Sequence, residues 1–263
     1  MGTGAITQYV DVAQLVLYLF WAFFAGLIYY LVRENHREGY PMDNGRPDRP
    51  AKLTGWPTPA PKVFKTAHGD VTVPDPAKDA RPLALKPPYG PGNAGTALEP
   101  TGNPMLDGVG AAAYTPRADR PDEDLHGKPK LVPLRILADA GFSIPARDVD
   151  PRGLEVIATD GAVAGTVRDL WIDASEFLVR YYEVSVITPG GLRNVLLPRE
   201  FALLKSFRGH SHMRCDALTA AQFADVPATR NPDVVTLMEE ERVVAYYGGG
   251  MLYATPERAE PLV

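Results

Sequence analysis

The sequence predicts a single membrane-spanning helix near the amino terminus, followed by a mainly antiparallel β domain, a small barrel, that ends in a short helix. Three observations predict this fold class. A long apolar run without charge occurs near the start, 18 of the 26 prolines follow it between positions 41 and 133, and β-type runs separated by turn residues fill the second half. The expected organisation is an anchor over 1–35, an extended proline-rich surface segment over 36–133, and the barrel with its helix over 134–263.

Residues 12–32 (VAQLVLYLFWAFFAGLIYYLV) contain no charged side chain and one amide, Gln14. A helix of this length rises about 31 Å, which matches the hydrocarbon core of a bilayer. A signal peptide is one alternative, but no basic region precedes the run and no small-residue cleavage site follows it. A buried core helix is the other, and such helices usually keep a polar face. We therefore expect residues 12–32 to span a membrane once.

The charges that flank the apolar run predict its orientation. Only Asp11 precedes it, whereas four arginines and a histidine follow it, namely Arg33, His36, Arg37, Arg46 and Arg49. The positive-inside rule then places the amino terminus outside and the rest of the chain in the cytoplasm. The single cysteine, Cys215, fits a reducing compartment, and the net charge of −5 does not suggest a nucleic acid partner.

Prolines dominate residues 36–133 and exclude long helices and central strands, because proline lacks an N–H and restricts the residue before it. Residues 71–73 are one of the short strands expected here. Scattered aromatic and aliphatic residues favour an extended chain that lies over another part of the protein, and intrinsic disorder is the alternative. The pattern G-x-G-x-x-G at 90–95 is expected to be a loop, because no strand precedes it and no helix follows it.

Four runs rich in Val, Ile, Leu and Tyr are predicted to be strands: 154–158, 163–173, 178–187 and 192–197. Turn residues at 160–161, 173–176 and 189–191 separate them, which predicts antiparallel neighbours in a small barrel or sandwich. Strands and helices do not alternate, which argues against a nucleotide-binding sheet. A final helix is expected over 239–247, capped by Asn231 or Asp233 and ended by the glycines at 248–250. The acidic run 239–241 would then lie on a solvated face near the helix start.

Several motifs in a fixed order resemble a known family. They are 37–41 (REGYP), 61–64 (PKVF) with 68–69 (HG), 100–104 (PTGNP) with 107–110 (DGVG), 150–153 (DPRG), 169–173 (DLWID) and 245–254 (AYYGGGMLYA). In these motifs, and over nearly its whole length, the chain resembles the H subunits of the purple-bacterial photosynthetic reaction centre. The resemblance implies a cytoplasmic barrel of the PRC type that caps and stabilises the membrane subunits L and M.

The resemblance also implies the place of the cofactors and partners. Bacteriochlorophyll, bacteriopheophytin, quinones, carotenoid and the non-haem iron belong to L and M, so this chain is expected to bind no cofactor and to be no enzyme. Its membrane helix contains no histidine that could ligate a chlorophyll magnesium. The light-harvesting 1 antenna and membrane lipids are further implied partners, and a cytochrome subunit is left open. The implied location is the bacterial inner (intracytoplasmic) membrane, with a periplasmic amino terminus and a cytoplasmic C-terminal domain.

Two other functions compete with this one. A membrane-tethered PRC-barrel that serves as an adaptor for unrelated partners is the first, and copurification with or without near-infrared pigments distinguishes it. A membrane-anchored hydrolase is the second, but no nucleophile–base pair or metal motif in the sequence supports it.

The resemblance implies that the subunit conducts protons from the cytoplasm to the secondary quinone. It assigns this role first to Glu176 and Asp173, with Arg180 nearby. From the residues alone, an acidic turn with an arginine indicates a solvated salt bridge worth under about 1 kcal/mol. A relay needs carboxylates that alternate between acid and base, which burial or a nearby like charge favours. We expect Glu176 to point inward and Asp173 to stay nearer the turn.

The segment 124–130 is the second candidate, with Asp124, His126 and Lys130. Histidine titrates near neutral pH and beside an acid is a suitable proton donor at a surface, and the resemblance places proton uptake here. Some members of the family carry a second histidine where this chain has Lys128, which weakens both the uptake role and an inhibitory metal site. An ordinary exposed loop histidine is the alternative.

The pattern formed by His210, His212 and Cys215 is the third candidate. On a strand the two histidines face the same way, and with a cysteine nearby they could bind zinc. No fourth ligand is evident, and the family assigns no such role to this segment. We expect a polar strand end and no metal site.

Overall fold

The computed structural model describes residues 4–7, 9–40, 55–75, 82–88, 90 and 96–259. The chain divides into two compact units, of which the first comprises Met1–Pro82 and Pro87–Ala97, and the second Leu83–Lys86 and Leu98–Val263. Arg46 and Arg49, and residues 91–95 of the expected glycine loop, lie outside the described residues. The apolar helix belongs to the first unit and the β domain to the second.

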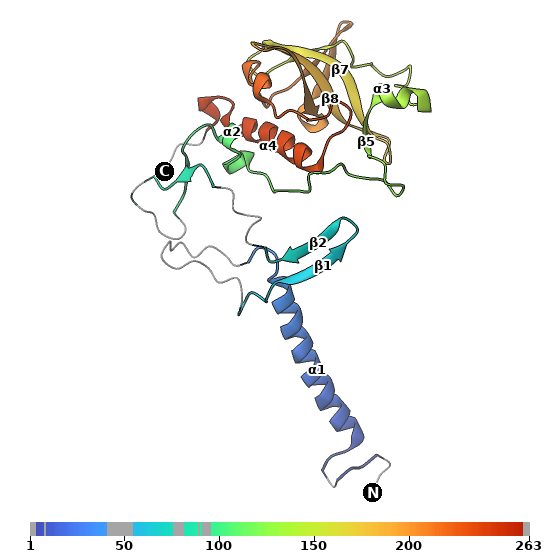
Figure 1. Cartoon of the computed structure of the whole chain (residues 1–263), viewed down its shortest axis with the longest axis vertical. Coiled ribbons are helices and arrows are strands. Elements are labelled where there is room, and N and C mark those ends of the chain that lie inside the picture. Colours follow the sequence, from blue (N-terminus) through green and yellow to red (C-terminus); the bar gives the residue numbers. More distant parts are fainter. Residues whose placement is uncertain are drawn as a thin grey trace. The chain divides into compact units, whose positions relative to one another are not determined.

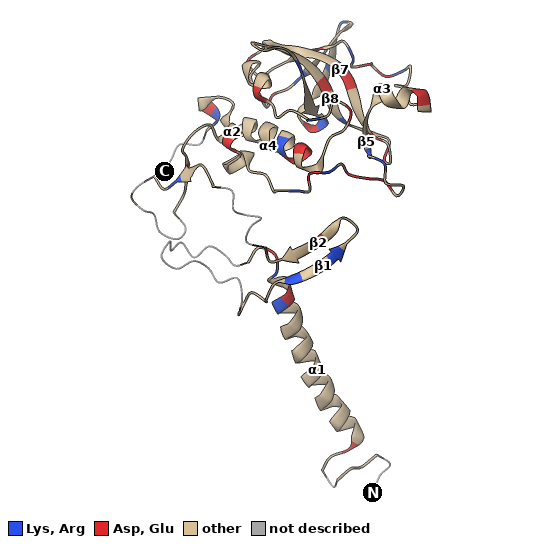
Figure 2. Cartoon of the chain, in the orientation of Figure 1, with Lys and Arg blue, Asp and Glu red and all other residues tan. Residues whose placement is uncertain are grey.

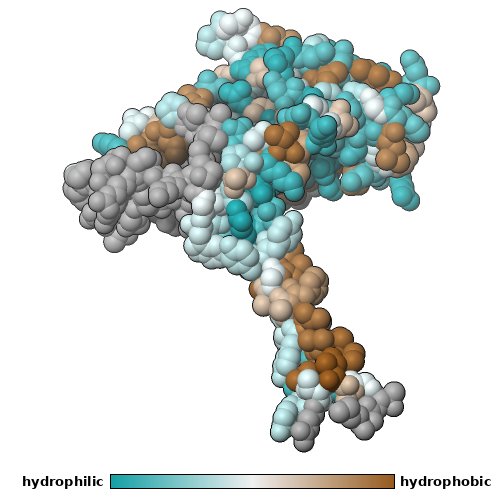
Figure 3. Space-filling view, turned by 60° about the horizontal axis from the view of Figure 1, so that its bottom comes forward, coloured by the Kyte–Doolittle hydropathy of each residue, from teal (hydrophilic) through white to brown (hydrophobic). Residues whose placement is uncertain are grey.

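The first unit contains the predicted membrane helix. Helix α1 (Val12–Asn35) has 24 residues, and the carboxylate of Asp11 caps it by accepting a hydrogen bond from the Gln14 N–H at 2.7 Å. Its charged residues lie only in the last turn (Figure 2), and strongly apolar residues follow its length (Figure 3). No residue of α1 is buried within this chain. A helix that is long, apolar and exposed all round suits a single membrane span.

The C-terminal end of α1 is fastened to the segment that follows at 55–75. The strands of this segment are β1 (Lys62–Thr66) and β2 (Gly69–Val73), which pair antiparallel. The guanidinium group of Arg37 donates to the Glu34 carboxylate at 2.8 and 2.9 Å. It also donates to the carbonyl oxygens of Ala60 at 2.6 Å and Val73 at 3.2 Å. One arginine therefore holds both ends of the hairpin at the last turn of the helix.

The second unit is built on one curved sheet of seven strands (Figure 1). Its strands are β5 (Leu131–Pro133), β6 (Glu155–Ile157), β7 (Val163–Asp173), β8 (Leu178–Thr188), β9 (Gly191–Pro198), β10 (Leu203–Phe207) and β11 (His210–Arg214). They are ordered β10-β11-β6-β7-β8-β9, and β5 also pairs with β7. The four predicted strands correspond to β6, β7, β8 and β9, and the predicted turns join them. The mainly antiparallel β domain is thereby confirmed.

Two features of the sheet differ from the sequence prediction. Strands β6 and β11 are parallel neighbours, pairing Val156 with Met213 and Ile157 with Arg214, whereas the turn spacing predicts antiparallel neighbours. Strands β7 to β10 lie between these two in the chain, so no hairpin turn dictates their direction. Strands β5 and β10 are not among the predicted strands; β5 pairs antiparallel with β7, and β10 with β11.

Short elements connect these parts. They are the paired strands β3 (Leu85–Lys86) and β4 (Glu99–Pro100), the helices α2 (Pro104–Asp107) and α3 (Leu134–Leu137), and 3-10 turns at Gly110–Ala112, Ala138–Ala140, Arg199–Phe201, Ala221–Asp225 and Pro256–Arg258. The expected short strand at 71–73 forms part of β2. Within the described part of the proline-rich segment no strand or helix exceeds five residues, as its prolines predict.

Strand β7 is covered on both faces. Val167 and Trp171 point into the main core, which α4 also contributes to, whereas Leu170 and Ile172 pack with Leu134 of α3 in a second cluster. Burial is continuous from residue 169 to 172 and does not alternate. The register with β8 shifts within this stretch, which is typical of β-bulges. The sheet therefore separates a large core from a smaller one.

Helix α4 (Leu237–Tyr253) lies beside α2 and packs against the sheet (Figure 1). Its N-cap is Thr236, so the expected caps Asn231 and Asp233 are wrong. The Thr236 hydroxyl accepts from the Glu239 N–H at 3.2 Å, and the Glu239 carboxylate accepts from the Thr236 N–H at 2.9 Å. This capping box leaves Glu239 only 7% exposed, so the acidic run 239–241 is not a solvated face throughout.

The glycines at 248–250 do not end α4, which continues to Tyr253. A Cβ atom at Gly249 would lie 2.5 Å from the Cβ atom of Ala112, and one at Gly250 would meet the carbonyl oxygen of Ala217. Glycine in a helix interior costs about 1 kcal/mol relative to alanine. Here the missing side chains let the helix approach its neighbours closely, and that packing offsets the conformational cost.

We predict that Gly249→Ala lowers the free energy of unfolding by about 1–3 kcal/mol, because the added methyl group overpacks the contact with Ala112. Gly248→Ala is the matched control, since the nearest atom to its added Cβ would be the Ala111 carbonyl oxygen at 3.6 Å. That variant should be neutral or stabilised by up to about 1 kcal/mol. Chemical denaturation of both full-length variants measures the difference, and equal effects would contradict the close-packing explanation.

Candidate functional site

Strand β5 brings together the two segments that carry the predicted site residues. It pairs antiparallel with the end of β7, with Leu131 opposite Asp173. The Ala174 N–H donates to the Lys130 carbonyl oxygen at 2.8 Å, which extends the pairing beyond the strand. The loop 122–130 and the turn between β7 and β8 therefore lie next to each other.

The carboxylate of Asp124 organises the loop 122–130. Its Oδ1 atom accepts hydrogen bonds from the backbone N–H groups of His126 at 2.7 Å and Lys128 at 2.9 Å. The Lys128 N–H is the main reason that the pKa of Asp124 is lowered, and the His126 N–H adds to it. The side chain of His126 is exposed. Asp124 is thus an anionic turn former, with a histidine at the surface beside it.

Lys130 is the cation around which the carboxylates gather. Its Nζ atom lies 2.9 Å from Oδ2 of Asp122. This hydrogen bond is the main reason that the pKa of Lys130 is raised, and the negative charges of Asp173 and Glu176 raise it further. The same bond is the first cause of the lowered pKa of Asp122. Asp122 is a member of the site that the sequence analysis does not single out.

The turn between β7 and β8 is held by Asp173. Its Oδ1 atom accepts from the N–H groups of Ser175 at 2.9 Å and Glu176 at 3.1 Å. Phe177 closes the turn in the left-handed region, with a φ of 58°. Asp173 is half-buried and Glu176 is exposed. The expectation that Glu176 points inward is therefore wrong for this chain by itself, because the residue lies at the tip of a hairpin and not within a strand.

Glu240 of α4 is a second residue that the sequence analysis does not assign to the site. The hydroxyl of Tyr181 donates to its Oε2 atom at 2.8 Å. Burial is the main influence on the pKa of Glu240 and raises it. The hydrogen bond from Tyr181 and the charges of Arg180 and Arg117 act in the opposite direction. The Thr-x-x-Glu pattern at 236–239 could have predicted the helix start, but the burial of Glu240 depends on its contact with Tyr181 of β8, which no local pattern indicates.

Asp122 connects Glu240 with the cluster around Lys130. Its negative charge contributes to the raised pKa of Glu240, while its carboxylate binds Lys130 directly. Arg180 is exposed, and in the described part of the chain no ion pair joins it to Glu176. Its charge acts instead on Glu240 and Tyr181. The resulting set runs from exposed groups to a half-buried carboxylic acid.

The third sequence candidate contributes no ligand set. His210 is exposed on β11, whereas Cys215 is fully buried in the main core, where burial raises the pKa of its thiol. Within the described ranges, no group of three His, Cys, Asp or Glu side chains is arranged to hold a metal ion.

The chemistry available at this site is acid–base chemistry. It brings together exposed and half-buried carboxylates, an ammonium group, a surface imidazole and a half-buried glutamate that accepts a hydrogen bond from a tyrosine. The Lys130 ammonium group favours the ionised form of Asp122 and backbone N–H groups favour that of Asp124, whereas burial favours the protonated form of Glu240. Such a graded set can take up a proton from water and pass it on.

Two family models match the chain. The model of the photosynthetic reaction centre H-chain N-terminal region matches residues 4–136, which is half of the chain, and the model of the PRC-barrel domain matches residues 146–213. The first includes α1 and the loop 122–130, and the second includes β6 to β10 and most of β11. By these matches, and by the apolar helix and antiparallel β domain that accompany them, the chain belongs to the family of photosynthetic reaction centre H chains.

Proposed function

We propose that this chain caps the L and M subunits on the cytoplasmic side and conducts protons to the secondary quinone. Membership of the H-chain family implies association with the reaction centre core subunits. The observation that carries the proton-transfer role is the pairing of β5 with β7, which brings the loop 122–130 to the turn at 173–178. Two segments that are far apart in the sequence thereby form one titratable surface.

The proposed setting follows from the helix and the family. Helix α1 spans the bacterial inner membrane once, with the amino terminus periplasmic and the second unit in the cytoplasm, as the arginines after the helix favour. The chain is a structural subunit and not an enzyme. Bacteriochlorophyll, bacteriopheophytin, carotenoid, quinones and non-haem iron are held by L and M. The light-harvesting 1 antenna and lipids are the further partners proposed, and a cytochrome subunit stays open.

The proposed route starts in the loop 122–130. His126 is exposed and takes up protons from cytoplasmic water, and Asp124 fixes the backbone of the loop that presents it. Lys130 and Asp122 form an ion pair at the base of this loop. The pKa of Asp122 is lowered and that of Lys130 is raised, so both residues stay charged. They hold the neighbouring groups in place and are poorly suited to carry the proton themselves.

Glu176 and Asp173 are the proposed acceptors beyond the loop, since their charges lie close enough to Lys130 to raise its pKa. Glu176 is exposed in this chain, so the surfaces of L and M are what would enclose it in the complex. Glu240 offers a further carrier, because burial raises its pKa and Tyr181 provides it with a hydrogen-bonded neighbour.

A membrane-tethered adaptor for unrelated partners is the alternative. An adaptor does not need the titratable surface formed by the loop 122–130 and the turn at 173–178, whereas that surface suits proton uptake. Purification of the full chain from its native membrane decides between the two, since absorption by near-infrared pigments in the same fraction indicates the reaction centre.

We predict that a reaction centre stripped of this chain keeps its primary charge separation and loses efficient turnover of the secondary quinone. The reason is that the proposed role lies in proton delivery, while the cofactors of charge separation are placed in L and M. Flash absorption on the intact and the stripped complex measures both steps. Loss of the first picosecond steps in the stripped complex would contradict this assignment.

We predict that Glu176→Gln slows the second electron transfer to the secondary quinone at least tenfold at about pH 9 and less at about pH 6. The glutamine keeps the shape but cannot carry a proton, and alternative donors are depleted at high pH. Tenfold corresponds to about 1.4 kcal/mol on the barrier. The first transfer, which places no proton on the quinone, should change little. Flash absorption across this pH range measures both transfers.

Glu155→Gln is the matched control, because Glu155 is an exposed glutamate on β6, away from the turn at 173–178. Asp173→Asn should act like Glu176→Gln but more weakly, since asparagine can still accept the N–H groups of Ser175 and Glu176. Small weak acids in the buffer should partly restore the rate. An unchanged second transfer in Glu176→Gln at every pH would remove this residue from the route.

We predict that Glu240→Gln becomes increasingly more stable than the native chain as the pH rises above 4.5, the ordinary value for glutamate. The pKa of Glu240 is raised in the folded state, so ionisation there costs stability; the cost is absent below 4.5 and complete above the raised pKa. Glutamine removes the cost and can still accept from Tyr181. Melting temperatures from about pH 4 to about pH 8 test this, with Glu241→Gln as control. A pH-independent difference would show that Glu240 is not perturbed by burial.

A further inference from the structure

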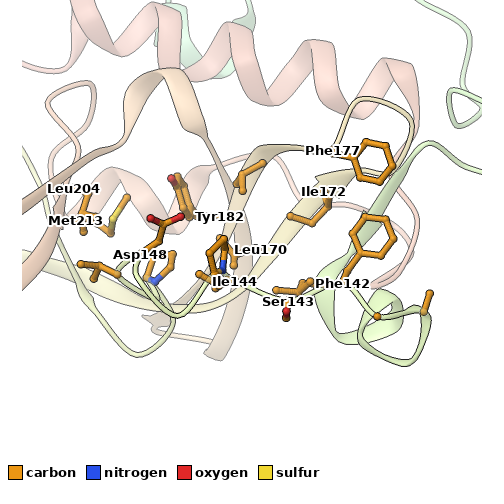
Figure 4. Close-up of a pocket in the computed structure, with 17 residues that line it drawn as sticks. Phe142, Ser143, Ile144, Asp148, Leu170, Ile172, Phe177, Tyr182, Leu204 and Met213 are labelled. Atoms are coloured by element: carbon orange, nitrogen blue, oxygen red, sulfur yellow. The ribbon is translucent and has the colours of Figure 1, made fainter.

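The second unit contains a cavity that the proposed proton route does not use. It has a volume of about 690 Å³ and lies between the segment 140–151 and the face of the sheet that carries the second hydrophobic cluster. Leu170 and Ile172 of β7 form its floor, and the hairpin of β10 and β11 contributes Leu204 and Met213. Figure 4 places Leu204 and Met213 at one end and the rings of Phe142 and Phe177 at the other. The cavity is therefore elongated.

The chain's own side chains do not fill this space. The cavity is partly open to solvent, and its size and apolar floor match pockets for small molecules, which measure about 300–1,000 Å³ and are mostly apolar. Phe177 is 73% exposed and Val149 is 44% exposed at its rim. The rings of Phe142 and Phe177 stack with their centres 5.5 Å apart and form the wall at that end. These properties indicate a site for an apolar molecule with an extended chain.

The polar groups of the cavity restrict the head group of its ligand. Among the described residues that line it, Asp148 is the one with a charged side chain, and Ser143 and Tyr182 add hydroxyl groups. A carboxylate accepts hydrogen bonds and repels an anion. The guanidinium group of Arg147 lies 3.9 Å from Asp148 and would repel a cationic head group, as Asp148 repels an anionic one. An uncharged donor, such as a hydroxyl group, suits this wall best.

We infer that the cavity binds an uncharged amphiphile with one linear apolar chain and a hydroxyl head group. The chain lies along Leu170 and Ile172, and the hydroxyl group donates to the carboxylate of Asp148. This cavity borders the turn between β7 and β8 at Phe177, but Asp173, Glu176 and Glu240 are not among its lining residues. Binding of the amphiphile does not depend on the proposed proton transfer.

The test uses the full chain held in an amphipathic polymer, which supplies no detergent monomers that would compete for the cavity. Calorimetric titration with 1-decanol should show saturable binding of one molecule per chain. Decanoate, which is an anion at about pH 8, should bind at least tenfold more weakly. Asp148→Asn should reduce this preference to less than threefold, whereas Asp139→Asn, at an exposed residue that does not line the cavity, should preserve it.

A second variant blocks the cavity itself. Val149→Trp places a large ring at the rim and should weaken 1-decanol binding at least tenfold, while Ile187→Trp, at a residue 86% exposed and outside the cavity, should not. Circular dichroism establishes that both variants are folded; if Val149→Trp is not, Asp148→Asn alone decides. Decanol uptake that never saturates, or equal affinity of the native chain for the alcohol and the carboxylate, would overturn the proposal.

Discussion

The pairing of β5 with β7 is the contact on which the rest of the site depends. Only three residues of β5 take part, yet they bring a loop from the proline-rich segment to the end of the longest strands in the sheet. Without this pairing, Asp122, Asp124 and Lys130 would have no fixed distance to Asp173 and Glu176. Electrostatic coupling between them falls off with distance and with exposure to solvent. The geometry of the loop therefore decides whether these residues act together.

A short strand at this position needs further support, and Arg135 provides it. Arg135 follows β5 by two residues, and its Nη1 atom lies 2.8 Å from Oδ2 of Asp169 and 2.7 Å from Oε2 of Glu183. Asp169 and Glu183 are each only 4% exposed and lie on the neighbouring strands β7 and β8. A buried carboxylate needs a cationic or hydrogen-bonding partner, since an unpaired buried charge is strongly destabilising. Glu183 also pairs with Arg168 at 2.7 Å, so the need of Asp169 for a cation is what fixes the position of Arg135, and with it that of β5 and α3.

The acidic residues around this contact differ in role because their surroundings differ. The carboxylate of Asp124 accepts hydrogen bonds from the backbone of its own loop, and that of Asp122 accepts one from Lys130. The pKa of each is therefore lowered. Glu240 lies where solvent is reduced, and its pKa is raised. Residues of one chemical type therefore become fixed charges or proton carriers according to their neighbours. This division is the physical basis of the proposed route.

Much of the fold follows from local patterns in the sequence. The uncharged run from 12 to 32 predicted α1, because its length and composition match a bilayer without reference to any partner. The strand 163–173 was predicted at its observed bounds, and the pairs β6–β7, β7–β8 and β8–β9 followed from turn residues between neighbouring apolar runs. Of the site, the sequence and its family resemblance indicated Glu176, Asp173, Asp124, His126, Lys130 and Arg180 as candidates.

Contacts between distant segments decided the remainder. No hairpin connects the strands of the parallel pair β6–β11 or of the pair β5–β7. Turn residues in the sequence therefore do not predict these two pairings. Glycine often marks the end of a helix, whereas the close approach to Ala112 and Ala217 explains why α4 continues through Gly249 and Gly250. The burial of Glu240 and the exposure of Glu176 likewise depend on which elements cover them. Local sequence determines which elements form, because hydrogen bonds and periodicity act over a few residues. Tertiary packing determines solvent access, and it is burial that raises the pKa of Glu240, whereas hydrogen bonds lower the pKa values of Asp122 and Asp124.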